Sequence, residues 1–329
     1  MSEVIYSNKL SKKFLDLLKL KLKSEFYNCK MIAIKIHFGE PKNNYAFKPD
    51  DIRPITNILK ELKIDFFFFD SPVAYESVRK TSEGQIRVAK EKGWDKLGEV
   101  RSSEDFIVVR GENMLYEVCK ELTEAEGVLV ISHFKGHACA GFGGAIKNLG
   151  MGALTKRTKS MIHDYGSPVF NIEDCIKCKN CYLSCPINGI KFTNRPIFVN
   201  CYGCSNCAYN CPAKAIRPKK NYFDVLLAEG ASIAQSKFKK YYYINVLKNV
   251  TKECDCEQDP KGIIAKDYGY FCSKDGVAID KASYDMIKKS EGDVFLNHNK
   301  KTGLQQVIAA EKFDMGKKEY KLRIIKSKE

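Results

Sequence analysis

The chain has 329 residues, enough for a sizeable core and at least two domains. Its net charge of +15 is compatible with nucleic acid, anionic lipid or an acidic protein as a partner. Its apolar runs are shorter than the roughly 20 residues of a membrane span, and the start, Met1-Ser2-Glu3, lacks the features of a secretory signal. The 14 cysteines fit a reducing compartment better than a disulfide scaffold. We therefore expect a cytoplasmic protein without a membrane span.

Apolar strands and amphipathic helices alternate through the first half of the chain. The patterns predict helices over 7–24, 53–63 and 113–123, and strands over 31–37, 64–70, 106–110 and 127–133. After residue 220 the pattern resumes, with a helix over 222–240, strands over 241–247 and 268–272, and helix and charged residues in the tail from Gln305. Because the main strands are apolar on both faces, we expect an α/β domain with a mainly parallel sheet. Residues 1–167 and 219–329 are its two parts.

Polar residues follow several of these strands where each one ends. His37 and Asp70 follow the first two main strands, and His133 and His137 follow a third. Ligands of parallel α/β sheets bind beyond the carboxyl ends of the strands. These side chains are therefore expected to share one site.

A glycine-rich run, Gly141–Gly152, leads into a further expected helix. Backbone N–H groups at such a helix start can bind an anion, and Lys147 is a candidate anion contact within the run. The alternative is a tight loop whose glycines are needed for close packing. The run carries no dinucleotide fingerprint, so a flavin or nucleotide is an optional occupant and not a required one.

The most informative stretch is a cysteine motif that occurs twice at an offset of 26 residues. The two copies are Cys175-x2-Cys178-x2-Cys181-x3-Cys185-Pro186 and Cys201-x2-Cys204-x2-Cys207-x3-Cys211-Pro212. In bacterial ferredoxins with this spacing, the fourth cysteine of each run binds the other cluster. Cluster one would be held by Cys175, Cys178, Cys181 and Cys211, and cluster two by Cys201, Cys204, Cys207 and Cys185. Structural zinc is the alternative, but zinc prefers paired ligands to tight triplets.

Residues 168–218 are therefore expected to form an inserted α+β ferredoxin-like module with two [4Fe–4S] clusters. Segment 168–220 carries eight lysines and arginines against only two acidic residues. A positive face would attract an acidic redox partner such as a ferredoxin or flavodoxin. The alternative is an ordinary solvated lysine-rich surface. Nucleic acid is disfavoured, because the lysines are scattered and form no arginine-rich or aromatic-interleaved motif.

A second constellation is centred on Cys254-Asp255-Cys256. Two cysteines one residue apart can offer two thiolates to one soft metal or to a further cluster. His37, His133 and His137 are candidates to complete this third metal site, with Cys139 as a further candidate. The alternatives are reduced loop thiols or a redox-active pair. Cys29 and Cys119 are interpreted as buried thiols of the core.

Together these motifs resemble the iron–sulfur proteins of the domain-of-unknown-function 362 family. The resemblance rests on four stretches: His133–His137, Gly141–Gly152, Cys254–Cys256 and Asp275–Asp280. Family members usually have Asp-Pro-Val-Ala where this chain has Asp275-Gly276-Val277-Ala278, a small departure in a turn. The resemblance covers nearly the whole chain and implies an α/β host domain with two [4Fe–4S] clusters, but no substrate.

The leading interpretation is an iron–sulfur electron-transfer protein or oxidoreductase that relays single electrons to a site in the α/β domain. The alternative is a non-enzymatic redox carrier, sensor or assembly factor that docks a protein client. Whether the chain is an enzyme stays open at this point, as do the substrate, the electron donor and the oligomeric state.

Overall fold

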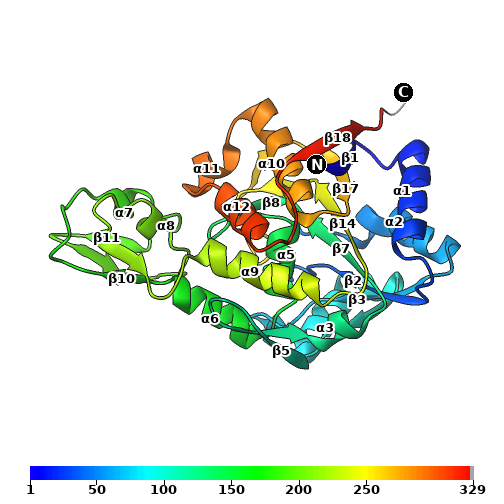
Figure 1. Cartoon of the computed structure of the whole chain (residues 1–329), viewed down its shortest axis with the longest axis horizontal. Coiled ribbons are helices and arrows are strands. Elements are labelled where there is room, and N and C mark those ends of the chain that lie inside the picture. The colour runs from blue at the N-terminus through cyan, green and yellow to red at the C-terminus, as the bar shows by residue number, and fades with distance from the viewer. Residues whose placement is uncertain (327–329) are drawn as a thin grey trace.

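The computed structural model describes residues 1–326, and an eight-stranded mixed sheet forms its centre. The strand order is β18-β1-β17-β14-β7-β2-β3-β4 (Figure 1). The bounds are β18 Tyr320–Ile324, β1 Ser2–Ser7, β17 Gly269–Ser273, β14 Tyr241–Leu247, β7 Val128–His133, β2 Met31–Lys35, β3 Asp65–Phe69 and β4 Glu99–Arg101. The strands β14, β7, β2, β3 and β4 are all parallel, whereas β17 runs antiparallel to β14 and β1. The expected mainly parallel sheet of an α/β domain is confirmed.

Helices cover both faces of this sheet, because the strands are apolar on both sides. In β3, Phe66 and Phe68 belong to one buried cluster, whereas Phe67 and Phe69 belong to the cluster on the other side. The first cluster includes side chains of α1 Lys12–Glu25, α2 Pro49–Glu61 and α3 Ser82–Glu91. The second includes α5 Ala145–Gly152, α6 Lys156–Gly166, α9 Phe223–Ser236, α10 Gly276–Glu291, α11 Val294–Asn299 and α12 Leu304–Lys312. This is a three-layer arrangement.

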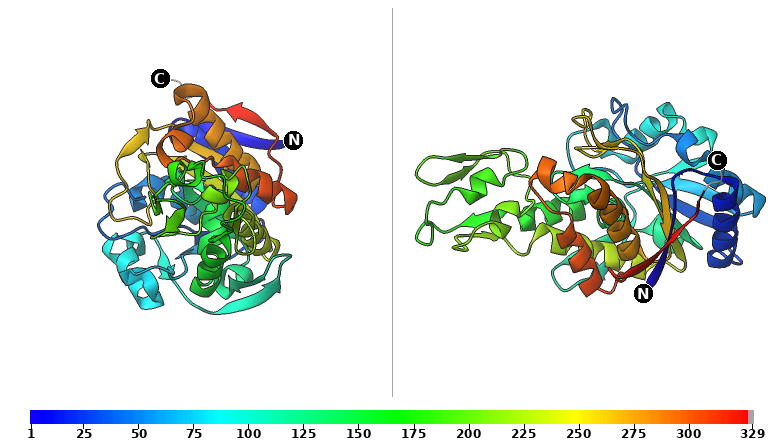
Figure 2. Two further views of the ribbon diagram at one scale, coloured as in Figure 1. Left: turned by 90° about the vertical axis from the view of Figure 1, so that its left-hand side faces the viewer. Right: turned by 90° about the horizontal axis from the view of Figure 1, so that it is seen from above.

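The segment 168–218 projects from one end of the molecule, at the left of Figure 1 and of the right-hand view in Figure 2. Its ends pair with each other, because β10 Pro168–Phe170 is antiparallel to β13 Ile216–Pro218. Strands from before and after the segment lie side by side in the central sheet, where β7 pairs with β14. In chain order the segment therefore falls between β7 and β14, which are neighbours in the central sheet.

The segment repeats its backbone geometry as well as its cysteines. The helix α7 Asn180–Leu183 corresponds to α8 Asn206–Tyr209, and β11 Ile190–Phe192, which pairs with β12 Pro196–Phe198, corresponds to β13. Three positions with positive φ also recur at the same offset of 26 residues. These pairs are Lys177 and Gly203 (56° and 66°), Lys179 and Ser205 (64° and 59°), and Asn188 and Lys214 (50° and 54°). Two equivalent half-segments fold in the same way.

Several local predictions differ from the structure. Residues 106–110 do form a strand, β5, but it pairs with β6 Leu115–Cys119 outside the central sheet. The helix expected over 113–123 is therefore wrong, since only α4 Lys120–Glu124 is helical. The first helix begins at Lys12, after the unpredicted strand β1, and the tail contains the unpredicted strand β18. The edge strand β18 was missed because it is short and carries the charged Lys321 and Arg323 on one face.

The remaining elements are short and connect the layers. They are two 3-10 turns, Val78–Lys80 and Trp94–Lys96, and the strand pairs β8 Lys135–His137 with β9 Gly141–Gly143 and β15 Val250–Thr251 with β16 Ile263–Ala265. In the part of the chain that the structure describes, no helix combines the length and apolar character that a membrane crossing requires.

Candidate functional site

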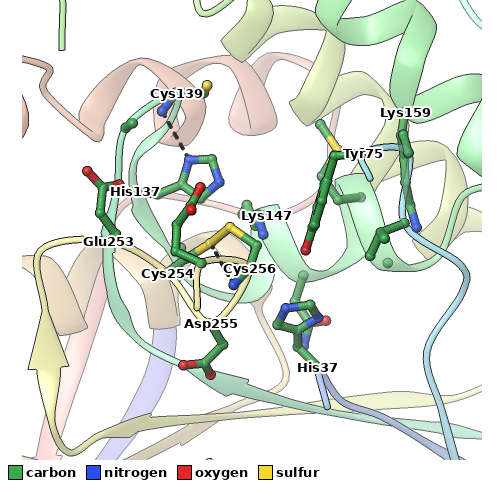
Figure 3. Close-up of a pocket in the computed structure, with 18 of the residues that line it drawn as sticks. His37, Tyr75, His137, Cys139, Lys147, Lys159, Glu253, Cys254, Asp255 and Cys256 are labelled. Atoms are coloured by element: carbon green, nitrogen blue, oxygen red, sulfur yellow. Dashed lines mark hydrogen bonds between the residues drawn. A yellow bond between two sulfur atoms is a disulfide. The ribbon is translucent and has the colours of Figure 1, made fainter. Parts of the chain in front are cut away.

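A cavity of about 680 Å³ opens at the carboxyl ends of β2, β3 and β7 (Figure 3). The loop between β15 and β16, which contains Cys254-Asp255-Cys256, forms another part of its wall. The structure brings the polar strand-end residues together as expected, because His37, Asp70, His133 and His137 all line this cavity. Lys147, Cys139 and the two cysteines of the loop line it as well.

Asp70 is the centre of a buried ionic network beneath the cavity. Its carboxylate accepts from Lys35 Nζ at 3.0 Å and lies 2.8 Å from His37 Nδ1. Lys35 is fully buried and also donates to Asn148 Oδ1 at 2.7 Å. Burial raises the pKa of Asp70, but the charge of Lys35 and the contact with His37 outweigh it and hold the pKa well below its usual range. Asp70 is therefore an ionised acceptor.

His37 presents an unpaired ring nitrogen to the cavity. Because the Asp70 carboxylate can only accept, Nδ1 of His37 donates to it. Burial, with the charge of Arg79 next, lowers the pKa of His37 to about 4, so the ring is neutral near pH 7. Its Nε2 then carries a lone pair, and among the described residues this buried atom has no hydrogen-bond partner. A neutral imidazole held by a carboxylate in this way can accept a proton or bind a metal.

His137 holds its ring proton on the other nitrogen from His37. Its Nδ1 accepts from the backbone N–H groups of Cys139 at 3.1 Å and Ala140 at 3.2 Å. Burial, and then the charge of Lys147, holds the pKa of His137 well below its usual value. The neutral ring therefore carries its proton on Nε2, and in Figure 3 this nitrogen lies on the side nearer the sulfurs of Cys254 and Cys256. His137 faces the cavity as a hydrogen-bond donor.

His133 is committed to the protein. Its Nε2 lies 2.5 Å from the carbonyl oxygen of Lys248, and its Nδ1 lies 2.9 Å from Asp255 Oδ2. Lys135 also contacts both His133 and Asp255, and the Asp255 side chain is 1% exposed. His133 lines the cavity, but it offers no free nitrogen to a metal. It fixes the loop that carries the two cysteines.

Cys254 and Cys256 are joined by a disulfide in the structure. One ligand atom from each of Cys254, Cys256 and His137 lies within 4.8 Å of the others, which is metal-site spacing. Two features oppose a metal there: a disulfide offers no thiolate, and the His137 nitrogen that faces the sulfurs carries a proton. Of the five residues predicted for a third metal site, only these three group together among the described residues. The disulfide state favours the alternative of a redox-active pair.

The glycine-rich run binds an anion, but the anion is part of the chain. The N–H groups of Ala145 and Ile146, at the start of α5, donate to the Asp280 carboxylate at 2.7 and 2.9 Å. A Cβ added at Gly144 would lie 2.3 Å from Asp280 Oδ1, so close packing requires this glycine. The prediction that these backbone groups bind a ligand is therefore wrong, and the close-packing alternative holds.

Lys147 nevertheless projects into the cavity. Among the residues that the structure describes, its ammonium makes no hydrogen bond or ion pair, and burial lowers the pKa of Lys147 to about 8. A half-buried cation without a close partner is a suitable contact for an anionic group of a ligand. Lys147 therefore stays a candidate anion contact, through its side chain alone.

Sequence reasoning missed three basic residues of the site, Lys35, Arg79 and Lys159. Lys159 donates to Ser71 Oγ at 2.8 Å and to the Pro72 carbonyl at 2.6 Å, and burial lowers its pKa to about 8. Arg79 pairs with Glu40 at 2.6 Å, and both side chains are at most 2% exposed. Of the three, only Lys35 could have been identified from the sequence, because a lysine inside an otherwise apolar strand needs a buried partner.

The eight motif cysteines lie in the projecting segment in two groups. Cys175, Cys178, Cys181 and Cys211 line one small cavity together with apolar side chains. In the other group, burial raises the pKa values of Cys201, Cys204 and Cys207, and the neighbouring Cys185 raises each of them further. Cys201 and Tyr202 also line the large cavity. The fourth cysteine of each run thus lies with the triplet of the other run.

Backbone donors point at sulfur in the second group. Gly189 N donates to Cys185 Sγ at 3.1 Å, and Gly203 N donates to Cys201 Sγ at 3.3 Å. Such N–H···S contacts tune the reduction potentials of iron–sulfur centres. Two compact four-thiol groups with these donors and an apolar surround fit [4Fe–4S] clusters.

The fold and the cavity define an α/β protein with a mainly parallel sheet and a candidate site at the strand ends. The family model described as "Domain of unknown function (DUF362)" matches residues 32–285, and the chain belongs to this family. No curated protein matches the chain.

The solved structures similar to the chain include the following two. One is a structural-genomics crystal structure of a protein from Thermotoga maritima, with a TM-score of 0.45 and 11% identity, covering 93% of this chain and 60% of that one. The other is the lactate racemase apoprotein from Thermoanaerobacterium thermosaccharolyticum, with a TM-score of 0.42 and 12% identity, covering 91% of this chain and 57% of that one. This chain thus spans less than two thirds of the length of either structure.

Proposed function

We propose that this protein is an iron–sulfur oxidoreductase that passes single electrons from a redox partner to a substrate in the strand-end cavity. Residues 168–218 would act as a ferredoxin-like module, with the cluster ligands grouped as the cysteine spacing predicts. The observation that carries the proposal is the position of Cys201, which belongs to the second cysteine group and also lines the cavity. A bound [4Fe–4S] cluster supplies or takes up one electron at a time.

The residues of the cavity can bind and orient an anionic substrate. Lys147 offers an unpaired ammonium, and His37 offers a neutral ring nitrogen held in place by Asp70. A substrate anion near Lys147 would lie within reach of a proton acceptor, so proton transfer can accompany electron transfer. The cavity of about 680 Å³ is in the usual size range of sites for small molecules.

The surface of the segment supports a protein redox partner. It carries exposed apolar side chains, Ile176, Leu183 and Ile197, among its many lysines. Apolar contacts surrounded by positive charge suit a transient complex with an acidic carrier such as a ferredoxin or flavodoxin. The same surface favours the second candidate function, a redox carrier or sensor that docks a protein client.

An anaerobic reductive titration tests the proposal. Protein purified without oxygen should take up about two electrons per chain, with loss of the broad iron–sulfur absorbance and appearance of a reduced-cluster paramagnetic signal. Replacing Cys201 by Ser should disturb the second centre and leave the first. Replacing the buried core thiol Cys29 by Ser serves as a matched control and should change neither. Protein without iron-linked absorbance or electron uptake would contradict the proposal.

A further inference from the structure

We propose that Cys254 and Cys256 are a redox-active pair that accepts two electrons at the cavity wall, with His137 Nε2–H as the hydrogen-bond donor to the sulfur that becomes a thiolate. The electron source rests on the proposed function above. The inference goes further, since it assigns the acceptor of those electrons to two side chains of this protein.

The location of the pair supports this role. Cys254 is 4% exposed, Cys256 is partly exposed, and both line the same cavity as Cys201. A structural disulfide that joins residues so close in sequence closes a very short loop and adds little stability. A disulfide on a cavity wall is instead accessible to small reactants.

The loop around the pair is held on both sides, so the two sulfurs stay close after reduction. The Asp255 side chain contacts His133 and Lys135, and its carbonyl accepts from Glu40 N at 2.8 Å. The N–H of Cys256 donates to Cys254 Sγ at 3.2 Å, which also favours a thiolate on Cys254. A fixed pair can re-form its disulfide without rearranging the backbone.

His137 provides the second donor. Its two backbone hydrogen bonds to Nδ1 leave the proton on Nε2, and its ligand atom lies within 4.8 Å of both sulfurs. A neutral imidazole of this tautomer cannot lose its remaining proton near neutral pH, so it stabilises a thiolate by hydrogen bonding and does not protonate it. His137 is therefore a positioning residue of the pair.

The reaction balances with a low-potential one-electron donor as the co-reactant. The S–S bond breaks, two electrons arrive one at a time, and one proton comes from water in the cavity, which leaves as hydroxide. The products are one thiol and one thiolate, and the thiolate accepts the hydrogen bond from His137 Nε2. The pair thus converts two single-electron deliveries into one two-electron equivalent.

Thiol trapping tests this without any turnover assay. The whole chain, purified without oxygen and treated with a mild thiol oxidant, is mixed with a reduced viologen, acid-quenched, unfolded and alkylated. Trypsin releases Glu253–Lys261, which contains Cys254 and Cys256 as its only cysteines. We expect no alkyl groups on this peptide before reduction and two after it. A peptide that stays unalkylated after the iron centres have been reduced overturns the inference and leaves the proposed function standing. A peptide that is alkylated in both states also overturns it.

Protein without iron would instead overturn the proposed function. In that case, titration in a dithiol–disulfide redox buffer shows whether Cys254 and Cys256 change between the disulfide and the dithiol. A single transition from disulfide to dithiol supports the pair, and its absence overturns it.

The role of His137 is tested by the pH dependence of the alkylation rate of the reduced pair. His137→Ala should raise the midpoint of this profile by about one pH unit, because a thiolate donor is lost. His137→Gln, which keeps an N–H donor, should restore part of the shift. The exposed His298→Ala is the matched control and should not move the profile. An unchanged midpoint in His137→Ala would exclude a hydrogen bond to the thiolate.

Discussion

The buried pair Lys35–Asp70 is expected to stabilise the host domain and to orient His37. We consider Asp70→Asn, which leaves the Lys35 ammonium in place without its charged partner. Lys35 is 0% exposed and Asp70 is 2% exposed, with 3.0 Å between Nζ and Oδ1. Breaking a buried pair from one side costs about 3 to 5 kcal/mol, since the remaining charge stays out of water. Lys35 keeps its bonds to Asn148 and to the Ile36 carbonyl, so we expect the lower end, about 3 kcal/mol.

The companion variants make this a double-mutant cycle. Lys35→Met should also lose about 3 kcal/mol, because it removes the cation that pairs with the buried Asp70 carboxylate. The double variant Lys35→Met/Asp70→Asn leaves no unpaired charge and should lose less than the sum by about 2 kcal/mol. Asp50→Asn is the matched control, since Asp50 pairs with Arg53 on the exposed surface. This substitution should change the free energy of unfolding by less than about 0.5 kcal/mol.

Thermal unfolding followed by circular dichroism under anaerobic conditions measures these differences. At about 2 to 4 °C per kcal/mol, Asp70→Asn should lower the unfolding midpoint by roughly 6 °C or more. The absorbance of the cysteine-rich segment, measured below the transition, should be unchanged because Asp70 lies in the host sheet layer. Additive effects in the double variant would show that Lys35 and Asp70 do not interact energetically, and would refute the electrostatic account of the site.

Three further outcomes are expected. Asp280→Ala should destabilise the protein by about 1 to 2 kcal/mol in urea unfolding, because the N–H of Ala145 loses its capping acceptor; no loss would contradict this cap. Lys301→Met should cost about 3 to 5 kcal/mol in the same assay, since it leaves Asp224 buried and unpaired at 0% exposure; a change within error would refute that pairing. The depressed pKa of His37, about 4, should make stability fall as pH drops from about 6.5 to 4, by up to about 3 kcal/mol. A His37→Asn variant with an equal slope of stability against pH would contradict this.

The architecture of the sheet was predictable because its central strands are apolar on both faces. Phe66–Phe69 is the clearest case, since four consecutive phenylalanines can only be buried if alternate rings pack on opposite sides. The shared position of His37, Asp70 and His133 followed from the rule that parallel strands present their carboxyl ends at one edge. The direction of the parallel strands thus indicates the edge of the sheet at which a site forms.

Other features depend on contacts between distant residues and left no local pattern. The segment Leu115–Cys119 has apolar residues at helical spacing, yet it pairs with β5 as a strand. The carboxylate that binds the start of α5 comes from Asp280, 135 residues further along the chain than Ala145. The sequence also could not show which ring nitrogen of each histidine carries the proton, because two backbone N–H groups set the tautomer of His137. The residue types of the site were readable, but their hydrogen-bond roles were not.

The central claim is that residues 168–218 hold two [4Fe–4S] clusters, and a count of iron and acid-labile sulfide per chain tests it most directly. The measurement is made with a full metal scan on protein purified without oxygen. We predict about eight iron atoms and about eight sulfides per chain, with no stoichiometric zinc or nickel. Cys211→Ser should reduce the content of one centre, while Cys29→Ser should not. Stoichiometric zinc without sulfide would contradict the account and make the cysteine-rich segment a structural zinc module.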